Sequence, residues 1–363
     1  MLKAPIPYSA SLEKPEAGEA ETIKGIEEAL LGILETTSAD YGHAVRSVHA
    51  KSHGLLEAEL EVLADLPPEL AQGLFARPGR YPAIMRFSTN PGDVLHDSIS
   101  VPRGLAVKLL GVEGERLPDA EGTSQDFILV NGPAFVASSA KQFLGNLKLL
   151  AKTTDRAEWA KRALSAVLRG AETAIEAFGS ESATLKALGG APNVHPLGET
   201  YYSQSAFRYG DHVAKFSLTP VSHSLKALGG TVVDLQGQRN GIREAVIREM
   251  AVHGGEWELR VQLCRDAQSM PVEDPSVRWD ETASPFLPVA RLRAQAQTGW
   301  SDERAQVVDD NMRFSVWTGL EAHRPLGVIN RVRKQTYAAS ARFRGTFNGC
   351  PIHEPAGDVH LPG

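Results

Sequence analysis

The spacing of hydrophobic residues along the chain predicts both helices and strands. Apolar side chains recur every three or four positions in residues 22–37, which is the pattern of an amphipathic helix. Residues 257–263 alternate instead, so that Trp257, Leu259 and Val261 share one face of a strand and the polar residues between them share the other. Each pattern leaves one apolar face to be buried against the rest of the protein.

The order of the remaining segments favours an antiparallel sheet. Strand-like runs are expected at residues 46–63, 83–89, 103–111, 126–130, 212–221, 247–264 and 288–297, helical runs at 141–178, 305–313 and 327–341, and a loop at 189–209. Because strands and helices do not alternate regularly, a parallel sheet is not expected. The order predicts an α+β fold in which an antiparallel β-barrel is surrounded by helices.

Composition and charge exclude some classes of protein. The 363 residues are 42% hydrophobic and 23% charged, which is the balance of an ordinary globular protein. Residues 1–20, rich in proline, alanine and glutamate, predict a flexible N-terminal arm, and residues 21–363 a single domain. A net charge of -6 with dispersed arginines argues against nucleic-acid binding, and Cys264 and Cys350 lack the spacing of a zinc motif. No signal peptide and no apolar run of membrane-spanning length are found, which predicts a cytoplasmic protein without a transmembrane segment.

The first candidate for chemistry is a tyrosine in the last predicted helix. Arg333 precedes Tyr337 by four residues, so both lie on one face of the helix, where the guanidinium favours the tyrosinate. A tyrosinate is a hard anionic ligand of the kind that binds ferric iron. An ordinary basic amphipathic helix with a half-buried tyrosine explains the same pattern.

Two further motifs carry candidate residues. In Arg46-Ser-Val48-His49, a strand would point Val48 and His49 to opposite faces, with Arg46 on the side of Val48. In Arg86-Phe-Ser88, the arginine and the serine share one strand face, where a buried arginine needs an anion and a buried serine needs a hydrogen-bond partner. A structural histidine and an internal carboxylate would satisfy these patterns too, so each motif alone is weak.

Together, in their order and spacing, these motifs resemble the haem catalase family, and in particular its small catalase-related members. "RSVHAK" resembles the distal-histidine motif of that family, and "YPAIMRFST" and "DSISVPRGLAVKLLG" resemble the strands that follow it. "RVRKQTYAASARFR" resembles the proximal helix, and "GDHVAKFSLTPV" is a looser match. The resemblance runs in patches from about residue 40 to residue 345. It implies a catalase-like haem-binding barrel that lacks the C-terminal extensions of larger catalases.

The resemblance also implies a role for each matching residue. Tyr337 would be the metal ligand, binding the ferric iron of haem b, and Arg333 would hold it as the phenolate. His49 would move a proton between the two oxygens of a bound peroxide, and Ser88 would fix the tautomer of its imidazole.

The cofactor itself would be held mainly by arginines. The haem propionates would pair with Arg46, Arg86 and Arg344. Val48 would narrow the channel over the iron, and Phe135 is a candidate for an aromatic residue on the same side. Ser340 stands where most catalases carry a threonine on the proximal helix.

Two positions depart from the family pattern. Catalases place an asparagine on the distal side, whereas the corresponding stretch here, "TSQDFILVNGP", offers Ser124 or Gln125. Gln125 is the catalytic candidate of the two, because its amide can donate to a peroxide. Where many catalases have a histidine behind the arginine partner of the tyrosine, this chain has Gln204.

These departures favour a haem peroxidase of the minimal catalase fold, which would use hydrogen peroxide or an organic hydroperoxide and a small-molecule electron donor. Alternatives are a true catalase, a rearrangement of fatty-acid hydroperoxides of the allene oxide synthase kind, and a haem sensor or carrier with little turnover. The rearranging enzymes tend to carry threonine where this chain has Val48. The short N-terminal arm removes much of what holds catalase tetramers together, so a homodimer is expected.

Overall fold

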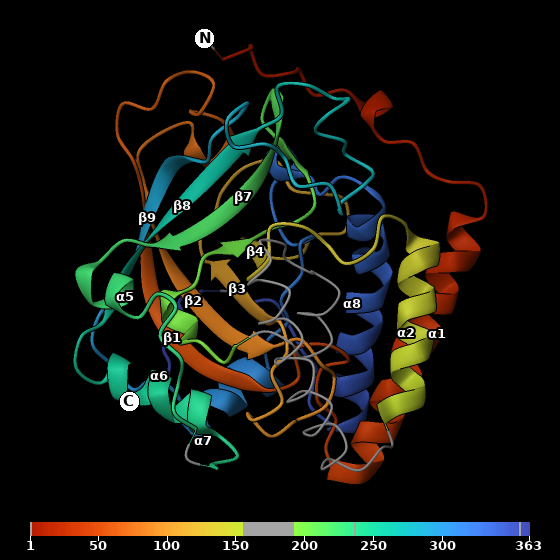
Figure 1. Cartoon of the computed structure of the whole chain (residues 1–363), viewed down its shortest axis with the longest axis vertical. Coiled ribbons are helices and arrows are strands. Elements are labelled where there is room, and N and C mark those ends of the chain that lie inside the picture. Colours follow the sequence, from red (N-terminus) through yellow and green to blue (C-terminus); the bar gives the residue numbers. More distant parts are fainter. Residues whose placement is uncertain (1, 155–191, 236, 356) are drawn as a thin grey trace, which may run out of the picture.

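The computed structural model describes residues 2–154, 192–235, 237–355 and 357–363 (Figure 1). In these residues nine strands form one sheet, in the order β5-β4-β3-β2-β1-β9-β8-β7-β6, and every ladder is antiparallel. A further pairing of β5 with β7 closes eight of the strands into a barrel. The strands are β1 (Ser52–Val62), β2 (Arg80–Thr89), β3 (Arg103–Leu109), β4 (Gln125–Val130), β5 (Tyr201–Tyr202), β6 (Phe207–Tyr209), β7 (His212–Pro220), β8 (Gly255–Leu263) and β9 (Leu287–Ala294). The predicted antiparallel barrel is therefore confirmed.

Helices cover the barrel on two sides. Figure 1 shows α8 beside the barrel, with α2 and α1 packed outside it, while α5, α6 and α7 lie at the other side of the barrel. The α-helices are α1 (Glu19–Tyr41), α2 (Ala140–Thr154), α5 (His223–Ala227), α6 (Gly241–Met250), α7 (Asp302–Ala305) and α8 (Val328–Phe347). Shorter turns are the 3-10 helices η1 (Ala10–Leu12), η2 (Gly73–Phe75), η4 (Pro196–Gly198) and η6 (Glu321–His323), and the π-helical turn η5 (Gln306–Asp310). Among the described helices, none combines the length and the apolar character needed to cross a membrane.

Several sequence-based boundaries need correction. Residues 46–51 were expected in a strand, but β1 begins only at Ser52 and the preceding residues form a loop. Residues 247–250 belong to the end of α6, because their apolar positions pack a helix against the barrel rather than extend β8. The expected loop at 189–209 contains β5 and β6 in its described part. The helix expected at 141–178 is present as far as Thr154, and its remainder lies outside the described residues.

Aromatic rings fill the barrel interior. The ring of Phe216 packs edge-on against Phe127, with centroids 5.0 Å apart, and against Phe207 at 5.4 Å. Phe87 packs in the same way on Tyr201 at 5.8 Å. Such edge-to-face pairs add to the free energy of burying the rings. The interior of the barrel is thus a packed core. A binding site is therefore expected on the outer face of the barrel wall.

Alternation along β2, β3 and β4 decides which side chains reach that outer face. Met85 and Phe87 point into the barrel and are fully buried, whereas Arg86 between them points outward. Arg86 pairs across the sheet with Ala106, and Ala106 pairs with Ile128, so these three residues form one row on the outer face. The strands therefore present a continuous wall to α8.

The N-terminal segment, expected as a flexible arm, has defined partners on the barrel. The backbone amide of Ile6 donates to the carbonyl of Cys264 at 2.8 Å, and that of Tyr8 donates to Asp211 at 2.7 Å. Arg331 of α8 binds the carboxylates of Glu13 and Glu19 at 2.7 and 2.6 Å. The segment is in this way joined to the helix that carries Tyr337.

Candidate functional site

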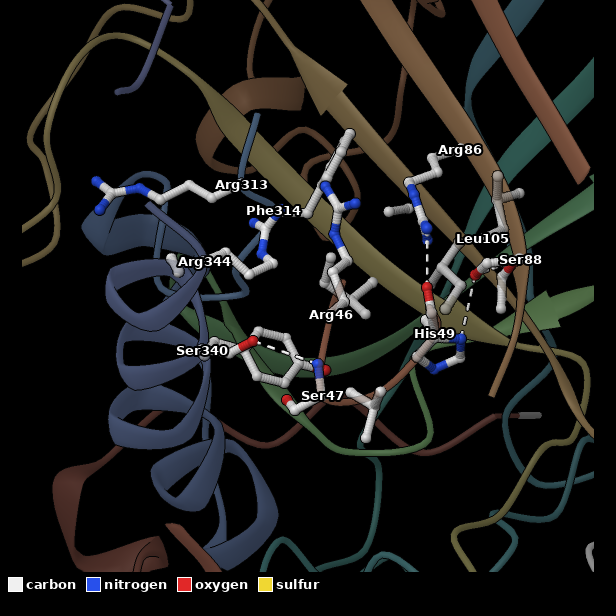
Figure 2. A pocket seen from close by; sticks show the side chains of 17 residues that line it. Arg46, Ser47, His49, Arg86, Ser88, Leu105, Arg313, Phe314, Ser340 and Arg344 are labelled. Carbon is white, nitrogen blue, oxygen red and sulfur yellow. Dashed lines mark hydrogen bonds between the residues drawn. The ribbon is translucent and has the colours of Figure 1, made fainter. Parts of the chain in front are cut away.

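A cavity lies between the outer face of the barrel wall and α8. Its lining comes from four parts of the chain: the loop before β1, the strands β2 to β4, the segment after η5, and the inner face of α8. The lining residues are Arg46, Ser47, Val48, His49, Arg86, Ser88, Gly104, Leu105, Ala106, Ile128, Leu129, Arg313, Phe314, Tyr337, Ser340, Ala341 and Arg344. Most candidate residues from the sequence are thus brought together in one place (Figure 2).

His49 lies on the barrel side of the cavity. Its backbone has a φ of 56°, in the left-handed region that non-glycine residues seldom adopt. This turn brings both His49 and Val48 to the cavity, whereas a strand would have sent them to opposite faces. The expected strand geometry at His49 is therefore wrong, because the loop and not alternation aims the imidazole.

Hydrogen bonds to β2 and β3 assign the tautomer of His49. Its Nδ1 lies 3.1 Å from Oγ of Ser88, as Figure 2 shows, and the Ser88 hydroxyl donates its own proton to the carbonyl of Gly104 at 3.4 Å. Oγ of Ser88 must then accept from Nδ1–H, which leaves Nε2 of His49 with a free lone pair. Ser88 is thus placed as the sequence predicts.

Electrostatics keep this imidazole neutral. Burial, together with the positive charges of Arg86, Arg333 and Arg46, lowers the pKa of His49 to about 3. At neutral pH the ring is then a free base, able to accept a proton at Nε2 and to pass it on.

Gly104 provides the space that His49 occupies. A Cβ at position 104 would lie 2.5 Å from Nδ1 of His49, far inside van der Waals contact. We expect Gly104→Ala to displace the ring from Ser88 and to lower the free energy of unfolding by about 1–3 kcal/mol, as overpacking does. Urea unfolding of Gly104→Ala checks the stability. Gly145→Ala serves as the control, because a Cβ there meets no atom within 4 Å. Equal stabilities of the two variants would contradict the close approach.

The α8 side of the cavity carries the tyrosine. Tyr337 lines it, and within the described residues its hydroxyl has no hydrogen-bond partner. Arg333 is buried one turn earlier, but its Nη1 donates to Oδ1 of Asn330 at 3.1 Å and forms no hydrogen bond to Tyr337. Oγ of Ser340 accepts from the amide of Ser47 at 3.4 Å and so joins α8 to the loop that carries His49. The tyrosine oxygen is left available to a ligand.

Three arginines meet at one end of the cavity around a carboxylate. Asp309, at the end of η5, accepts from Nε of Arg86 at 2.6 Å and from Nη1 of Arg46 at 3.1 Å. Its backbone carbonyl accepts from Nη1 of Arg344 at 2.6 Å. Burial alone would raise the pKa of Asp309, but Arg86 and Arg46 hold that pKa below its ordinary value, so the group is a carboxylate.

The arginine end of the cavity has positive charge to spare. Three guanidinium groups, which proteins do not deprotonate, surround the carboxylate of Asp309, and the neighbouring carboxylate of Asp310 also acts on Arg46 and Arg344, so the cluster keeps an excess of positive charge. Within the described residues, Nε of Arg344 is buried without a hydrogen-bond partner. A fourth arginine, Arg313, pairs with Glu354 and Glu121, each at 2.8 Å. The cluster is suited to a ligand with two carboxylates.

Four residues named from the sequence do not line the cavity: Arg333, Gln125, Phe135 and Gln204. Gln125 is buried at the start of β4, and its side-chain amide is engaged with the backbone: Oε1 accepts from the amide of Leu320 at 2.9 Å, and Nε2 donates to the carbonyl of Asp126 at 3.3 Å. Phe135 packs edge-on against Phe143, with ring centroids 5.1 Å apart. Nε2 of Gln204 donates to the carbonyls of Gly132 and Ala134, and Gln204 forms no hydrogen bond with Arg333.

Sequence reasoning missed three residues of the site. Asp309 sits in a stretch that resembles an ordinary polar helix, and Gly104 was noted only as part of a motif. Phe314 lines the cavity, and the guanidinium of Arg46 lies 5.8 Å from its ring centroid. Of these residues, Asp309 could have been found from the Arg86 motif. A buried arginine requires an anion, and the acidic residues of 309–310 offer one.

Barrel and cavity together define the class of this protein: it has the catalase fold. The structure is similar to a fungal catalase, with a TM-score of 0.61 and 16% identity over 90% of this chain and 65% of that one. Catalase A from Saccharomyces cerevisiae gives a TM-score of 0.61 and 16% identity over 90% of this chain and 67% of that one. A bacterial catalase gives a TM-score of 0.59 and 16% identity over 91% of this chain and 64% of that one. The chain thus spans about two thirds of the length of these catalases. No protein-family model and no curated protein sequence matches it.

Proposed function

We propose that the cavity binds haem b through Tyr337 and that the protein is a haem-dependent peroxidase of the minimal catalase fold. One observation carries the proposal: a tyrosine hydroxyl without a partner and a neutral imidazole face the same cavity, which ends in a cluster of arginines. The excess positive charge of Arg46, Arg86 and Arg344 suits the propionates of haem, and Nε of Arg344, which has no partner within the described residues, offers a donor to one of them. The residues present therefore fit this cofactor.

The chain's own residues account for the proton movements. Haem, held by Tyr337 and by Arg46, Arg86 and Arg344, would supply the redox chemistry of ferric iron for cleavage of the O–O bond. Nε2 of His49 accepts the proton of the inner peroxide oxygen and returns it to the outer oxygen, which leaves as water or an alcohol. Ser88 holds the imidazole in the tautomer that this transfer requires. A small-molecule donor would then return the two electrons taken by the peroxide, which with two protons release the remaining oxygen as water and restore the resting protein.

The same cavity favours peroxidase over catalase activity. Disproportionation in catalases uses a distal asparagine, and within the described residues no amide side chain lines this cavity. Gln125, the expected substitute, has its amide engaged with the backbone of Leu320 and Asp126. In the row next to Arg86 the wall is formed by Ala106 and Ile128, which have no donor for a second peroxide.

Three parallel assays test the function on the haem-reconstituted protein. Oxygen release from hydrogen peroxide, peroxide-dependent oxidation of a dye, and consumption of a lipid hydroperoxide are measured on one preparation. We expect dye oxidation with little oxygen release. Rapid oxygen release would instead establish a catalase, and hydroperoxide consumption without any donor would establish a rearrangement. Protein that retains no haem would overturn the proposal.

A further inference from the structure

The carboxylate of Asp309 is held by hydrogen bonds to both of its oxygens. Its Oδ1 accepts from Arg86 and Arg46, and its Oδ2 accepts from Oγ of Ser52 at 2.6 Å. Ser52 is fixed in turn, because Nε1 of Trp300 donates to its hydroxyl at 2.8 Å. The indole of Trp300 is covered by the guanidinium of Arg243, 3.6 Å from the ring centroid. Both oxygens of Asp309 are thus held in place, Oδ1 by two arginines that line the cavity and Oδ2 by Ser52, which does not line it.

The guanidinium of Arg86 connects this carboxylate to the loop of His49. Its Nε binds Asp309, while its Nη2 donates to the carbonyls of His49 at 2.8 Å and Ala50 at 3.2 Å; Figure 2 shows the bond to His49. A guanidinium is a rigid planar fork, so fixing Nε also fixes the direction of Nη2. The position of Asp309 therefore determines where the carbonyl of His49 can be held.

His49 needs such support because its backbone is strained. A φ of 56° brings the Cβ of a non-glycine residue close to the following carbonyl oxygen, so this conformation is less stable than a right-handed one. The amide of His49 donates to Asn90 at 2.7 Å, and that of Ala50 donates to Pro91 at 3.0 Å. These bonds fix the amide side of the loop, and Arg86 fixes the carbonyl side.

We propose that Asp309 is a positioning residue which, through Arg86, holds His49 in the left-handed conformation that aims its imidazole into the cavity. The catalytic meaning of this link rests on the proposed peroxidase function, whereas the link itself is a property of the chain. Neutralisation of Arg46 and Arg86 is the alternative role for the carboxylate. If Asp309 positions Arg86, an uncharged side chain that keeps an acceptor oxygen at position 309 can partly replace it. If Asp309 only neutralises charge, such a side chain cannot replace it.

Variants of this 363-residue chain separate these roles. Asp309→Asn keeps an oxygen that can accept from Nε of Arg86 but removes the charge, and Asp309→Ala removes both. Asp310→Asn is the matched control, since it removes one negative charge from the neighbouring residue, which pairs with His43 at 2.9 Å. The first readout is amide hydrogen exchange at His49 and Ala50 in the protein without haem. The second is the rate of the peroxide-dependent spectral change in the haem-loaded protein.

We expect Asp309→Ala to raise exchange at these two amides about tenfold while the amides of β8 stay protected. The peroxide step should slow about tenfold or more with haem content retained, as loss of a supporting partner typically does. Asp309→Asn should show a smaller change in both readouts, and Asp310→Asn none. Unchanged exchange in Asp309→Ala, or equal effects of the Asn and Ala variants, would overturn the proposal. If the wild-type chain bound no haem, the peroxidase proposal would fail, yet the exchange measurement would still decide the role of Asp309.

Discussion

We expect Tyr337→Phe to lose haem while the fold stays intact. The substitution removes one oxygen, and because that oxygen has no hydrogen-bond partner within the described residues, no internal bond is broken. The arginine cluster remains, so the carboxylates of the cofactor keep part of their binding energy. Loss of an outer partner alone typically costs 10–100-fold in metal affinity, and loss of the ligand itself should therefore weaken haem retention by more than about 100-fold.

Haem titration followed by absorption spectroscopy measures this effect, with unfolding in urea as the check on the fold. Tyr202→Phe is the matched control: it also removes one phenol oxygen, from a part-buried ring that packs on Phe286 at 5.7 Å, far along the chain from α8. A Tyr337→Phe variant with wild-type haem content and spectrum would show that the iron ligand is another residue.

Much of the site is predictable because its residues lie in short local motifs. Arg86 and Ser88 are two apart on β2, and alternation alone places both on the outer face of the barrel. Tyr337 and Ser340 are three apart on α8, which puts them on one face of the helix. All four line the cavity, as do Arg46, Val48, His49 and Arg344. Their chemical roles remain predictions.

The rest of the site depends on contacts between distant parts of the chain. Asp309 reaches Arg86 across 223 residues of sequence, and no local pattern distinguishes it from Asp310 beside it, which is bound to His43. The left-handed backbone of His49 has no sequence signal either, because such turns are usually marked by glycine. Gln125 was expected in the cavity from its place in a motif, but its side chain is used to hold the segment at Leu320. The position of Gln125 in the sequence therefore predicted that it lies at β4 but did not predict what its side chain binds.

We expect His49→Ala to keep haem but to lose nearly all of its reaction with peroxide. Neither Tyr337 nor the arginine cluster is changed, so the cofactor should be retained. The proton transfer between the peroxide oxygens loses its acceptor, and positioned acid–base catalysis contributes about 10²–10⁴-fold to such a step. Stopped-flow mixing of the haem-loaded variant with peroxide measures the loss. His43→Ala is the control, because His43 is an exposed histidine that pairs with Asp310 outside the cavity.

The pH dependence of the wild-type rate tests whether His49 acts as a base with a lowered pKa. Burial and the nearby arginines lower the pKa of His49 to about 3, so the imidazole stays unprotonated as the pH falls from neutrality, and it gains a proton only as the pH approaches that value. The peroxide step should therefore be nearly constant between neutral pH and about pH 5, whereas a histidine with an ordinary pKa near 6.5 would lose activity in this window. A rate in His49→Ala equal to that of the wild type would remove His49 from the mechanism. A wild-type rate that falls through pH 6.5 would leave His49 in place as a base but contradict the electrostatic effect of Arg86, Arg333 and Arg46 on it.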